Sequence, residues 1–547
     1  MVDQKPPEQI RVAVIGAGPQ GLCALKNLLE EGFDAELCEA RDVIGGLWAF
    51  SNDPNVFTTL ESTITNVSKL KNVYADFPCD NDFPLFPTQK EFLEYLEAYA
   101  EHFELKRRIK FKKKLLSLSR AEDGNGQMAW RLEFAEVYEL RDSKPVTIKT
   151  VEFFDKVIMA IGRHHSPHMP AIEGAEHFGK RLIHSAQFKR PEDYRNKRVL
   201  VLGFANTAGD TATELIGIAH TIYVAHRQGI LVLPRVLKGK PVEQLSNRRM
   251  DAILGTLSSW FPITMAKFMQ NMALKISDQA FSLKPAWGFR PAPSRFTQRV
   301  MISDTFVLAL EAGDIESVAN LKRIIDNEIV ELDDGTRLYV DNIICCTGMN
   351  PNRSFLESLG QRTKLDEDSA HKDVRLPRLY QNIFPPEYAS SIAFLDGWQA
   401  PTGICEVADL ACTAIVQIFK GAYPLPTIEE MNREIDQHQE WLHTIGLLPN
   451  EPGAARNAVQ ERKWRSWLHD AAGNGMNEYL GWGRKGWWFW LTNWRFCNML
   501  MGGVDSPHVG RLFEGRRKRW EGARKAIEEV NSEELARRKT DDNRKKK

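Results

Sequence analysis

Short apolar runs alternate along the chain with glycine-rich turns and with stretches of helical periodicity. The first run, Arg11–Ile15, is rich in β-branched residues and predicts a buried strand; the turn Gly16–Gly21 and a helical stretch over residues 22–31 follow it. The run Arg198–Leu202 begins the same order again, with a turn at residues 203–208. Two strand–turn–helix units predict an α/β fold with two Rossmann-like domains, each able to hold one dinucleotide.

Further elements follow from the same patterns. Residues 35–39 predict a second strand of the first unit, and Thr88-Gln-Lys-Glu91 forms a capping box that predicts a helix start. Residues 129–136 and 146–153 predict strands of a hairpin-like insertion, after which residues 154–162 return as a buried strand.

The second half of the chain contains two long helical regions in addition to the second unit. The second unit covers about residues 197–235, and a helical stretch covers about residues 242–272. Residues 338–347 predict a strand that follows a hairpin turn at Asp333–Thr336. From about residue 426 onward the chain is helical and rich in tryptophan, and it ends in the basic tail Asn543–Lys547.

Composition narrows the class of protein. The 547 residues are 43% hydrophobic and 26% charged, and 72 basic residues balance 72 acidic ones, so charge gives no reason to expect a nucleic acid partner. The eight cysteines form no CxxC pair, which argues against disulfides and zinc and favours a reducing, cytoplasmic location. His164, His165 and His168 lie in a predicted loop without a nearby carboxylate or thiol, so we expect no metal site. The N-terminus carries no apolar signal core, and no apolar run is long enough for a transmembrane segment.

The first unit carries a complete dinucleotide fingerprint. Glycines at positions 16, 18 and 21 allow the backbone to approach a pyrophosphate, and the helix N-terminus faces its charge. Glu39, 23 residues after Gly16, has the spacing of a carboxylate that accepts hydrogen bonds from a ribose. An acid there favours an unphosphorylated adenosine ribose, as in FAD. The candidate cofactor-binding residues of this turn are Gly16, Gly18, Pro19, Gln20, Gly21 and Glu39.

The second unit departs from the first at two positions. Ala205 replaces the middle glycine, and Ala208 holds the last position, where alanine is tolerated. Arg227 stands near the end of the second strand, where the first unit has an acid. Because a guanidinium can bind a 2′-phosphate, we expect NADPH here, with Gly203, Asn206, Thr207 and Arg227 as candidate binding residues.

These motifs resemble those of the flavin-containing monooxygenase family over most of residues 9–424. Lys180 departs from the identifying motif, which has glycine at that place, while Gly179 precedes it. The segments that carry the resemblance, in family order, are the first fingerprint, Gly45-Gly46-Leu47-Trp48, Thr65-Asn66-Val67-Ser68-Lys69, Asp76-Phe77-Pro78, Phe178 to Phe188, His226 to Arg235, Leu379 to Pro386 and Ser391 to Leu395.

The resemblance implies FAD and NADPH as cofactors and a small organic molecule and O2 as substrates. It further implies that NADPH reduces the flavin, that the flavin takes up O2 as a C4a-hydroperoxide, and that NADP+ shields that species from water. Oxygen then passes to a soft nucleophile, usually nitrogen or sulfur. The resemblance adds Gly46, Leu47, Trp48, Thr65 and Asn66 to the cofactor-binding residues. Asn66 is also the candidate catalytic residue, because a neutral amide can donate a hydrogen bond without supplying an acid.

The expected domains follow from the two units. Residues 1–165 and 330–425 are assigned to a discontinuous FAD-binding domain, and residues 166–329 to an inserted NADPH-binding domain with a helical insertion. The strands at residues 154–162 and 338–347 are interpreted as the crossings between them. Residues 426–547 are assigned to a helical cap with its basic tail.

Three other functions stay open at this point. Baeyer–Villiger oxidation of a ketone is the alternative within the same chemistry, because Phe188, Lys189 and Asp193 resemble part of the motif of type II enzymes of that kind. A disulfide oxidoreductase would need a redox cysteine pair near the flavin, and Cys345-Cys346 are adjacent residues that rarely bridge. A dinucleotide sensor without catalysis is the third.

The tryptophan-rich stretch at residues 482–501 has two interpretations. One is a packed cap over the first domain or the substrate entrance, and the other is a peripheral membrane contact flanked by Arg484, Lys485 and Arg495. A homodimer is also left open.

Overall fold

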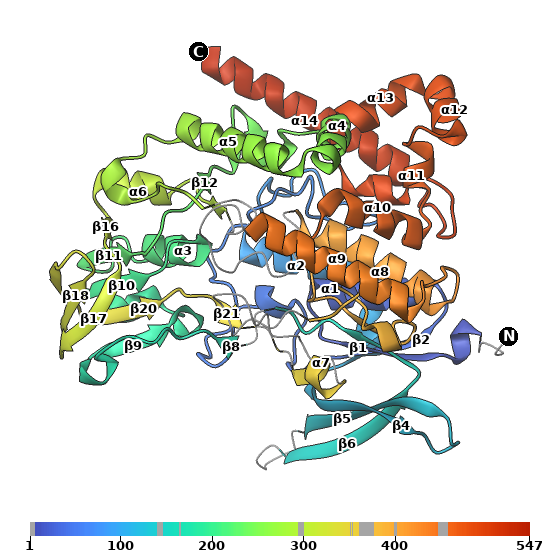
Figure 1. Cartoon of the computed structure of the whole chain (residues 1–547), viewed down its shortest axis with the longest axis horizontal. Coiled ribbons are helices and arrows are strands. Elements are labelled where there is room, and N and C mark those ends of the chain that lie inside the picture. The colour runs from blue at the N-terminus through green and yellow to red at the C-terminus, as the bar shows by residue number, and fades with distance from the viewer. Residues whose placement is uncertain are drawn as a thin grey trace.

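Two parallel sheets form the body of the protein in a computed structural model. It describes residues 6–138, 146–163, 166–293, 300–350, 352, 354–359, 377–398, 402–446 and 458–546. Figure 1 shows the two sheets side by side, with helices packed around them. The prediction of an α/β chain with two Rossmann-like units is confirmed.

The first sheet contains five parallel strands in the order β22-β7-β1-β2-β3. The central strand β1 begins and ends where its apolar run predicts, because a strand covered on both faces needs apolar side chains at nearly every position. The bounds are β1 Arg11–Ile15, β2 Asp34–Cys38, β3 Ile109–Lys110, β7 Lys156–Met159 and β22 Ile392–Phe394.

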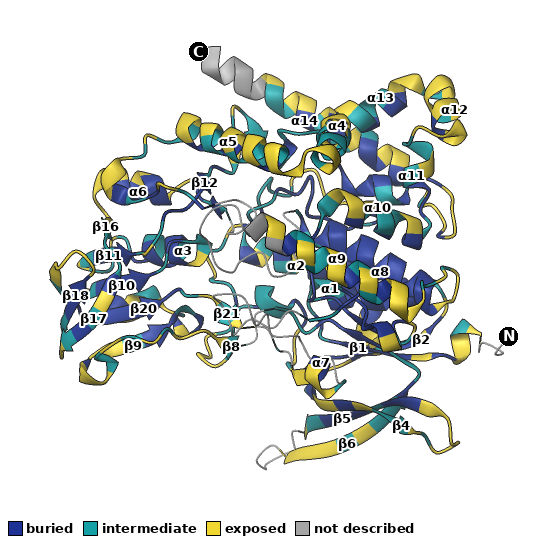
Figure 2. Cartoon of the chain, in the orientation of Figure 1, coloured by how far each residue is buried: buried dark blue, intermediate teal, exposed yellow. Residues whose placement is uncertain are grey.

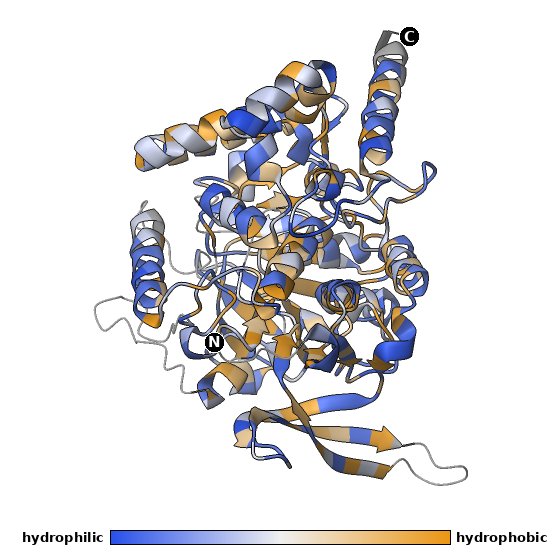
Figure 3. Cartoon of the chain, turned by 90° about the vertical axis from the view of Figure 1, so that its right-hand side faces the viewer, coloured by the Kyte–Doolittle hydropathy of each residue, from blue (hydrophilic) through white to orange (hydrophobic). Residues whose placement is uncertain are grey.

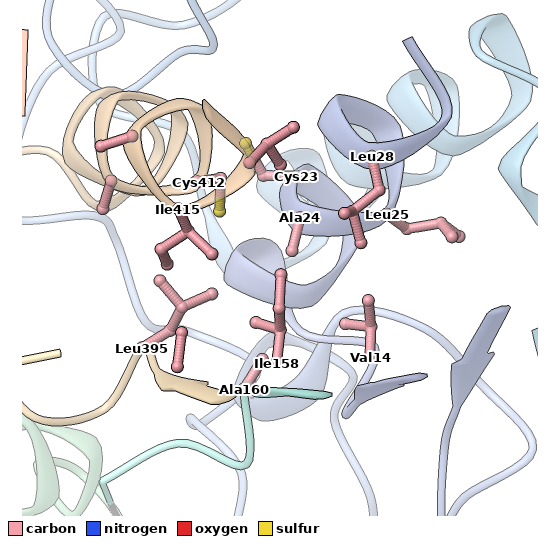
Figure 4. Packing of buried hydrophobic residues seen from close by; sticks show 14 of the residues in the cluster. Val14, Cys23, Ala24, Leu25, Leu28, Ile158, Ala160, Leu395, Cys412 and Ile415 are labelled. Carbon is pink, nitrogen blue, oxygen red and sulfur yellow. The ribbon is translucent and has the colours of Figure 1, made fainter. Parts of the chain in front are cut away.

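Helices α1 (Pro19–Glu30) and α8 (Ile404–Phe419) cover one face of this sheet. Figure 4 shows Cys23 and Ala24 of α1 facing Cys412 and Ile415 of α8, above Val14 and Ile158 of the strands. Every residue of α8 from Cys405 to Phe419 is buried, so this helix lies inside the molecule. The first glycine turn is therefore fixed between a rigid sheet and a buried helix pair.

The second sheet repeats the arrangement with the parallel order β16-β11-β10-β20-β9. Helix α3 follows β10 as α1 follows β1, and α6 (Phe306–Ala312) packs against α3. An antiparallel sheet, β17-β18-β19, lies beside it in Figure 1. The bounds are β9 Arg181–His184, β10 Arg198–Leu202, α3 Asn206–Glu214, β11 Thr221–Ala225, β16 Glu316–Val318, β17 Leu321–Asp326, β18 Ile329–Leu332, β19 Arg337–Tyr339 and β20 Asn342–Cys345.

Strand pairing changes one detail of the expected chain path. Strand β20 pairs with β10 and β9. The sequence interpretation assigned residues from 330 onward to the first domain, and for β18, β19 and β20 that assignment is wrong. The apolar run alone could not show the difference, because either sheet would bury it equally well.

Smaller elements connect and extend the two sheets. Helix α2 (Gln89–His102) begins at the predicted capping box, in which Thr88 accepts a hydrogen bond from the Glu91 amide. The predicted insertion strands are two members of a three-stranded antiparallel sheet, which Figure 3 shows projecting from the body. Its strands are β4 Lys113–Glu122, β5 Met128–Tyr138 and β6 Val146–Phe154, and the remaining short elements are β8 Ser166–Pro167, β12 Val232–Leu233, β13 Val236–Leu237, β14 Lys240–Pro241, β15 Met301–Ile302, β21 Met349–Asn350 and α7 Ser354–Ser358.

The remaining helices lie in two groups. In the helical stretch of the second unit, α4 (Arg248–Trp260) and α5 (Pro262–Ala280) form a pair that extends eight residues beyond the predicted end at 272. The C-terminal region is helical, as predicted, and its last helix runs to Lys546, into the segment expected to be a tail. The helices are α9 Ile428–Gly446, α10 Glu461–Ala472, α11 Met476–Tyr479, α12 Arg484–Thr492, α13 Trp494–Gly502 and α14 Ala523–Lys546. Across the described residues, we find no helix that combines the length and the apolar character needed to cross a membrane.

A buried cluster of charges joins the C-terminal region to the first unit. Glu30, Asp76 and Asp409 face Lys26, Arg511 and Arg517, with Arg511 Nη1 2.7 Å from Asp76 Oδ2 and Nη2 2.5 Å from Glu30 Oε1. Burial would raise the pKa of Glu30, but Arg517, Arg511 and Lys26 outweigh it and hold that pKa below its ordinary value. Removing one member would leave an unpaired buried charge, so the cluster fixes the C-terminal region against α1.

Candidate active site

The first glycine turn is closed by backbone contacts that leave no room for side chains at two positions. Gly16 has φ of 105°, and a Cβ there would lie 2.5 Å from the carbonyl oxygen of Ala160. A Cβ at Gly21 would lie 1.7 Å from the carbonyl oxygen of Gly16. These two glycines are therefore required by the packing of the protein itself.

Gly18 differs from its two neighbours in the fingerprint. A Cβ at Gly18 would meet only Gly46 Cα, at 3.8 Å, which is an ordinary van der Waals contact. The fold therefore does not need glycine at this position. A ligand whose pyrophosphate must come close to the backbone does need it, so the residue fits a dinucleotide.

The helix that follows begins without a side-chain cap. Gly18 is the N-cap of α1 and makes no side-chain hydrogen bond, whereas Thr88 caps α2 with its hydroxyl. The first N–H groups of an α-helix have no partner within the helix, and they carry the positive end of its dipole. An uncapped N-terminus beside an open glycine is a suitable site for a phosphate group.

Glu39 is held in place by two backbone amides. It is 8% exposed; the Ala17 amide donates to its Oε2 at 2.6 Å, and the Arg41 amide donates to its Oε1 at 2.8 Å. Each carboxylate oxygen can accept a further hydrogen bond. The residue is thus pre-oriented for ribose hydroxyls, the role that its spacing predicts.

The second glycine pair lies directly against the first turn. The Gly45 amide donates to the Ala17 carbonyl at 2.8 Å, and Gly46 has φ of 56°. Leu47 and Trp48 follow in a short helical turn, where the Trp48 ring packs edge-on against Phe92 with centroids 4.6 Å apart. The structure therefore brings Gly46, Leu47 and Trp48 to the same side of the sheet as the fingerprint.

One acid beside this turn was not among the predicted residues. Asp396 follows β22, and the neighbouring Leu395 carbonyl accepts a hydrogen bond of 2.6 Å from Gln20 Nε2. Burial raises the pKa of Asp396 to about 7. The signal in the sequence is that Asp396 directly follows the apolar segment Ser391 to Leu395, at the carboxyl end of a strand, where ligands bind in such sheets.

The second glycine turn has the same first position and a different middle position. Gly203 has φ of 132°, and a Cβ there would lie 2.6 Å from the Cys346 carbonyl oxygen, at the end of β20. Ala205 is the N-cap of α3 and makes no side-chain hydrogen bond. The second helix N-terminus is thus also uncapped, but a methyl group stands where the first turn has a hydrogen.

The other predicted residues of the second unit lie around α3. The side-chain amide of Asn206 is hydrogen-bonded within the protein. Its Oδ1 accepts from the Ile302 amide at 2.8 Å, and its Nδ2 donates to the Val300 carbonyl at 3.3 Å. Thr207 is exposed in the first turn of α3. Arg227 is exposed just past β11, beside His226, whose ring stacks on Phe204 with centroids 3.7 Å apart. Arg227 is therefore available for a phosphate at the surface of this unit.

Asn66 lies between the two units and is held by an arginine from the second one. Arg235 Nη2 donates to Asn66 Oδ1 at 3.1 Å and to the Ile64 carbonyl at 3.2 Å, and Arg235 Nε donates to the Thr65 carbonyl at 3.1 Å. Asp304 pairs with Arg235 Nη1 at 3.2 Å. Because a guanidinium only donates, the contact identifies the oxygen of the Asn66 amide and leaves its two N–H donors for another partner.

Thr65 adds an unsatisfied group next to this amide. Its Oγ1 is buried and has no hydrogen-bond partner among the described residues. Buried hydroxyls are normally paired, so an orphaned one next to the Asn66 amide fits a bound ligand. Thr65 and Asn66 thus both carry unused donors on a segment that contacts the second unit through Arg235.

His184, the other candidate base in the sequence, is used structurally. Its Nδ1 accepts from the Ala186 amide at 3.1 Å, so its Nε2 carries the proton and donates to the Gly348 carbonyl at 2.9 Å. Burial lowers the pKa of His184. The ring connects β9 to the end of β20 and has no free nitrogen for catalysis.

Metal and thiol chemistry find no support at these turns. The described residues contain no group of three His, Cys, Asp or Glu placed to hold a metal ion, and His164 and His165 lie outside the described residues. All eight cysteines are free thiols, and burial raises the pKa of both Cys345 and Cys346 to about 12. A thiol of such a pKa is a poor nucleophile, which disfavours the disulfide oxidoreductase alternative.

Comparison with known proteins agrees with this geometry. A family model described as flavin-binding monooxygenase-like matches residues 9–545. The chain is 38% identical over 531 residues to the monooxygenase aurF of Gibberella zeae, covering 96% of this chain and 98% of that protein. It is 30% identical over 437 residues to flavin-containing monooxygenase 5 of Oryctolagus cuniculus, covering 79% and 77% of the two chains.

Solved structures share the fold at lower identity. The S-allyl-L-cysteine S-oxygenase of Allium sativum aligns with a TM-score of 0.60 at 20% identity, covering 85% of this chain and 88% of that one. The cyclohexanone monooxygenase of Rhodococcus sp. Phi1 bound to NADP+ aligns with a TM-score of 0.57 at 17% identity, covering 84% and 97%.

Proposed function

The chain belongs to the flavin-binding monooxygenase-like family, and on this basis we propose that it oxygenates a small organic substrate at a soft nucleophilic nitrogen or sulfur atom. Enzymes of this family use FAD and NADPH. In the proposed reaction one atom of O2 enters the substrate as an N-oxide or sulfoxide. The other leaves as water, with two electrons and one proton from NADPH and one proton from solvent.

We assign FAD to the first turn and NADPH to the second. Gly18, Gly46 and Glu39 would hold the pyrophosphate and adenosine ribose of FAD, and Arg227 would hold the 2′-phosphate of NADPH. The FAD part then comprises the first sheet with its helices. The NADPH part is continuous through β20.

The contact between Arg235 and Asn66 is the observation that carries the proposal. It joins the Thr65-Asn66 segment to an arginine of the second unit and occupies the amide oxygen of Asn66, so the N–H groups of this neutral amide remain to donate. A bound flavin, reduced by NADPH, supplies the activation of O2. The protein's own contribution is to orient the two cofactors, exclude water and donate hydrogen bonds without an acidic proton.

Baeyer–Villiger oxidation of a ketone is the second candidate. It is supported by the sequence motif that contains Phe188, Lys189 and Asp193. In the structure Lys189 follows the buried Phe188 and donates from Nζ to the Val56 carbonyl at 2.7 Å and to Thr58 Oγ1 at 3.2 Å. Lys189 thus ties the motif segment to the loop that follows Trp48. That contact is compatible with either chemistry, so the product distinguishes them.

The test is oxygen transfer from 18O2 by the holoenzyme with NADPH. N,N-Dimethylaniline, thioanisole and cyclohexanone serve as amine, sulfide and ketone probes, with NADPH consumption and labelled product measured together. A labelled N-oxide or sulfoxide is the expected result. A labelled lactone without heteroatom oxidation would favour the second candidate, and hydrogen peroxide as the sole product with all three would contradict both.

The role of Asn66 is tested by Asn66→Asp, with Asn52→Asp on an exposed loop as the matched control. We expect Asn66→Asp to keep bound FAD and to oxidise NADPH with most of the electrons lost to hydrogen peroxide. The control should keep the wild-type product per NADPH. A wild-type product yield in Asn66→Asp would contradict the assigned role.

A further inference from the structure

One surface of the molecule carries most of its exposed tryptophan. Helices α4, α5, α12 and α13 lie along the upper edge in Figure 1, where Figure 2 colours much of their length as exposed. No residue of α4 is buried, although Ile253 and Trp260 are among its side chains. Of the two interpretations of residues 482–501, the packed cap does not fit the tryptophans, since Trp482, Trp487, Trp488, Trp490 and Trp494 are all exposed. Trp260, on α4, is exposed as well.

The helices form one continuous surface rather than two separate patches. Arg249 of α4 donates from Nη2 to Asn498 Oδ1 of α13 at 2.8 Å. Arg248, at the start of α4, pairs with Asp505 at 2.6 Å, within a buried ionic group that includes Lys71. The polar end of α4 is thus anchored, while Trp260, at its other end, is 70% exposed.

The helices that form this surface carry a net positive charge. Helices α12 and α13 contain three basic residues, Arg484, Lys485 and Arg495, and no acidic residue. Helices α4 and α5 contain four basic residues and two acidic ones. The whole chain is neutral, so positive charge and exposed aromatic rings are concentrated together.

We propose that this tryptophan surface binds a membrane that contains anionic lipids. Indole rings are favoured in the interfacial layer, where the ring is apolar and its N–H meets water, and basic side chains attract anionic headgroups. Helices α12 and α13 have nine residues each, about half the length that spans a bilayer, so they would lie in the interface. A second copy of the chain fits less well, because two like-charged surfaces would repel each other.

The test is cosedimentation of the FAD-loaded full-length protein with vesicles. One set is phosphatidylcholine alone, and the other contains about 30% phosphatidylserine, which supplies the negative surface potential. Trp482→Ser/Trp488→Ser/Trp494→Ser removes three exposed rings. The matched control Val146→Ser/Ile148→Ser/Val151→Ser removes exposed apolar side chains from β6.

We expect the wild-type protein to bind the anionic vesicles. Binding should fall at least about tenfold in the tryptophan variant, because each indole ring buries apolar surface in the membrane, and it should stay unchanged in the control. Arg484→Gln/Lys485→Gln/Arg495→Gln should weaken binding to anionic vesicles only. Unchanged NADPH oxidation in solution would show that each variant is folded. Absence of vesicle binding by the wild-type protein, equal binding by the tryptophan variant, or a dimer that the tryptophan variant abolishes without any vesicle binding would overturn the proposal.

Discussion

At Gly16 and at Gly203 the two nucleotide turns meet the same restriction. In both, φ is positive, and a Cβ would lie 2.5 to 2.6 Å from a carbonyl oxygen at the end of the adjacent strand. At the middle position of the fingerprint the two turns differ. The first turn has Gly18, where a Cβ would touch nothing closer than 3.8 Å, and the second has Ala205. The first glycine is thus a requirement of the fold, whereas the fold does not require the middle glycine, and we expect the bound dinucleotide to require it.

The largest expected effect comes from a glycine that the fold needs. Gly21→Ala would place a Cβ 1.7 Å from the Gly16 carbonyl, so we expect destabilisation by more than about 3 kcal/mol and loss of bound FAD. Thermal unfolding and the ratio of flavin to protein measure it. A stable, flavin-loaded variant would show that the turn is less tightly closed than the structure indicates.

Gly18→Ala tests the binding of FAD separately from the stability of the fold. The added Cβ makes only an ordinary van der Waals contact with Gly46 Cα, so we expect an apoprotein that unfolds at nearly the wild-type temperature. We expect it to bind FAD at least about tenfold more weakly, because the pyrophosphate can no longer approach the backbone. FAD titration of the apoprotein by fluorescence, beside its melting curve, provides the measurement. If stability and affinity fall together, the distinction between the two glycines fails.

Arg227→Gln acts on the second turn alone. Losing one charge-assisted hydrogen bond of about 1.5–3 kcal/mol should raise the KM for NADPH about 10- to 100-fold and reduce the preference for NADPH over NADH. FAD content should not change, because Arg227 lies on the other sheet. Steady-state kinetics with both nucleotides measure the effect, and an unaltered preference would remove Arg227 from the site.

Ala205→Gly should have the smallest effect. If the second ligand has adapted to the methyl group, restoring glycine changes the KM for NADPH by less than about threefold. The same kinetic assay is used, with Arg227→Gln as the reference for a large change. A much tighter NADPH site in this variant would show that Ala205 weakens binding in the natural chain.

Local pattern was sufficient to predict the elements that hold the site. Strands β1 and β10 have their predicted bounds, and α2 begins at its predicted capping box. The signals there are apolar runs and hydrogen bonds between residues a few positions apart. Strand β4 was missed because an irregularity between Leu115 and Ser117 breaks the alternation: its buried leucines, Leu115 and Leu118, lie three positions apart among charged and polar residues.

Contacts between distant residues could not be predicted in this way. Arg235 and Asn66 are 169 residues apart, and β20 could have joined either sheet. Arg235 ends one of the segments that resemble the family, but the partner of its side chain depends on how the second unit packs against the first. Asp396 was missed for the same reason, since its place beside the first glycine turn depends on how β22 packs in the sheet.

The charge cluster around α1 has a consequence for the order in which the protein is made. Glu30 leaves the ribosome 481 residues before its partner Arg511, and Arg517 follows still later. During that interval Lys26 is the sole member of the cluster's three cations available to Glu30, Asp76 and Asp409. The first unit is synthesised first, yet its interior charges are balanced last. Chaperone dependence should therefore be concentrated in the early half of the nascent chain, and end when the C-terminal arginines emerge.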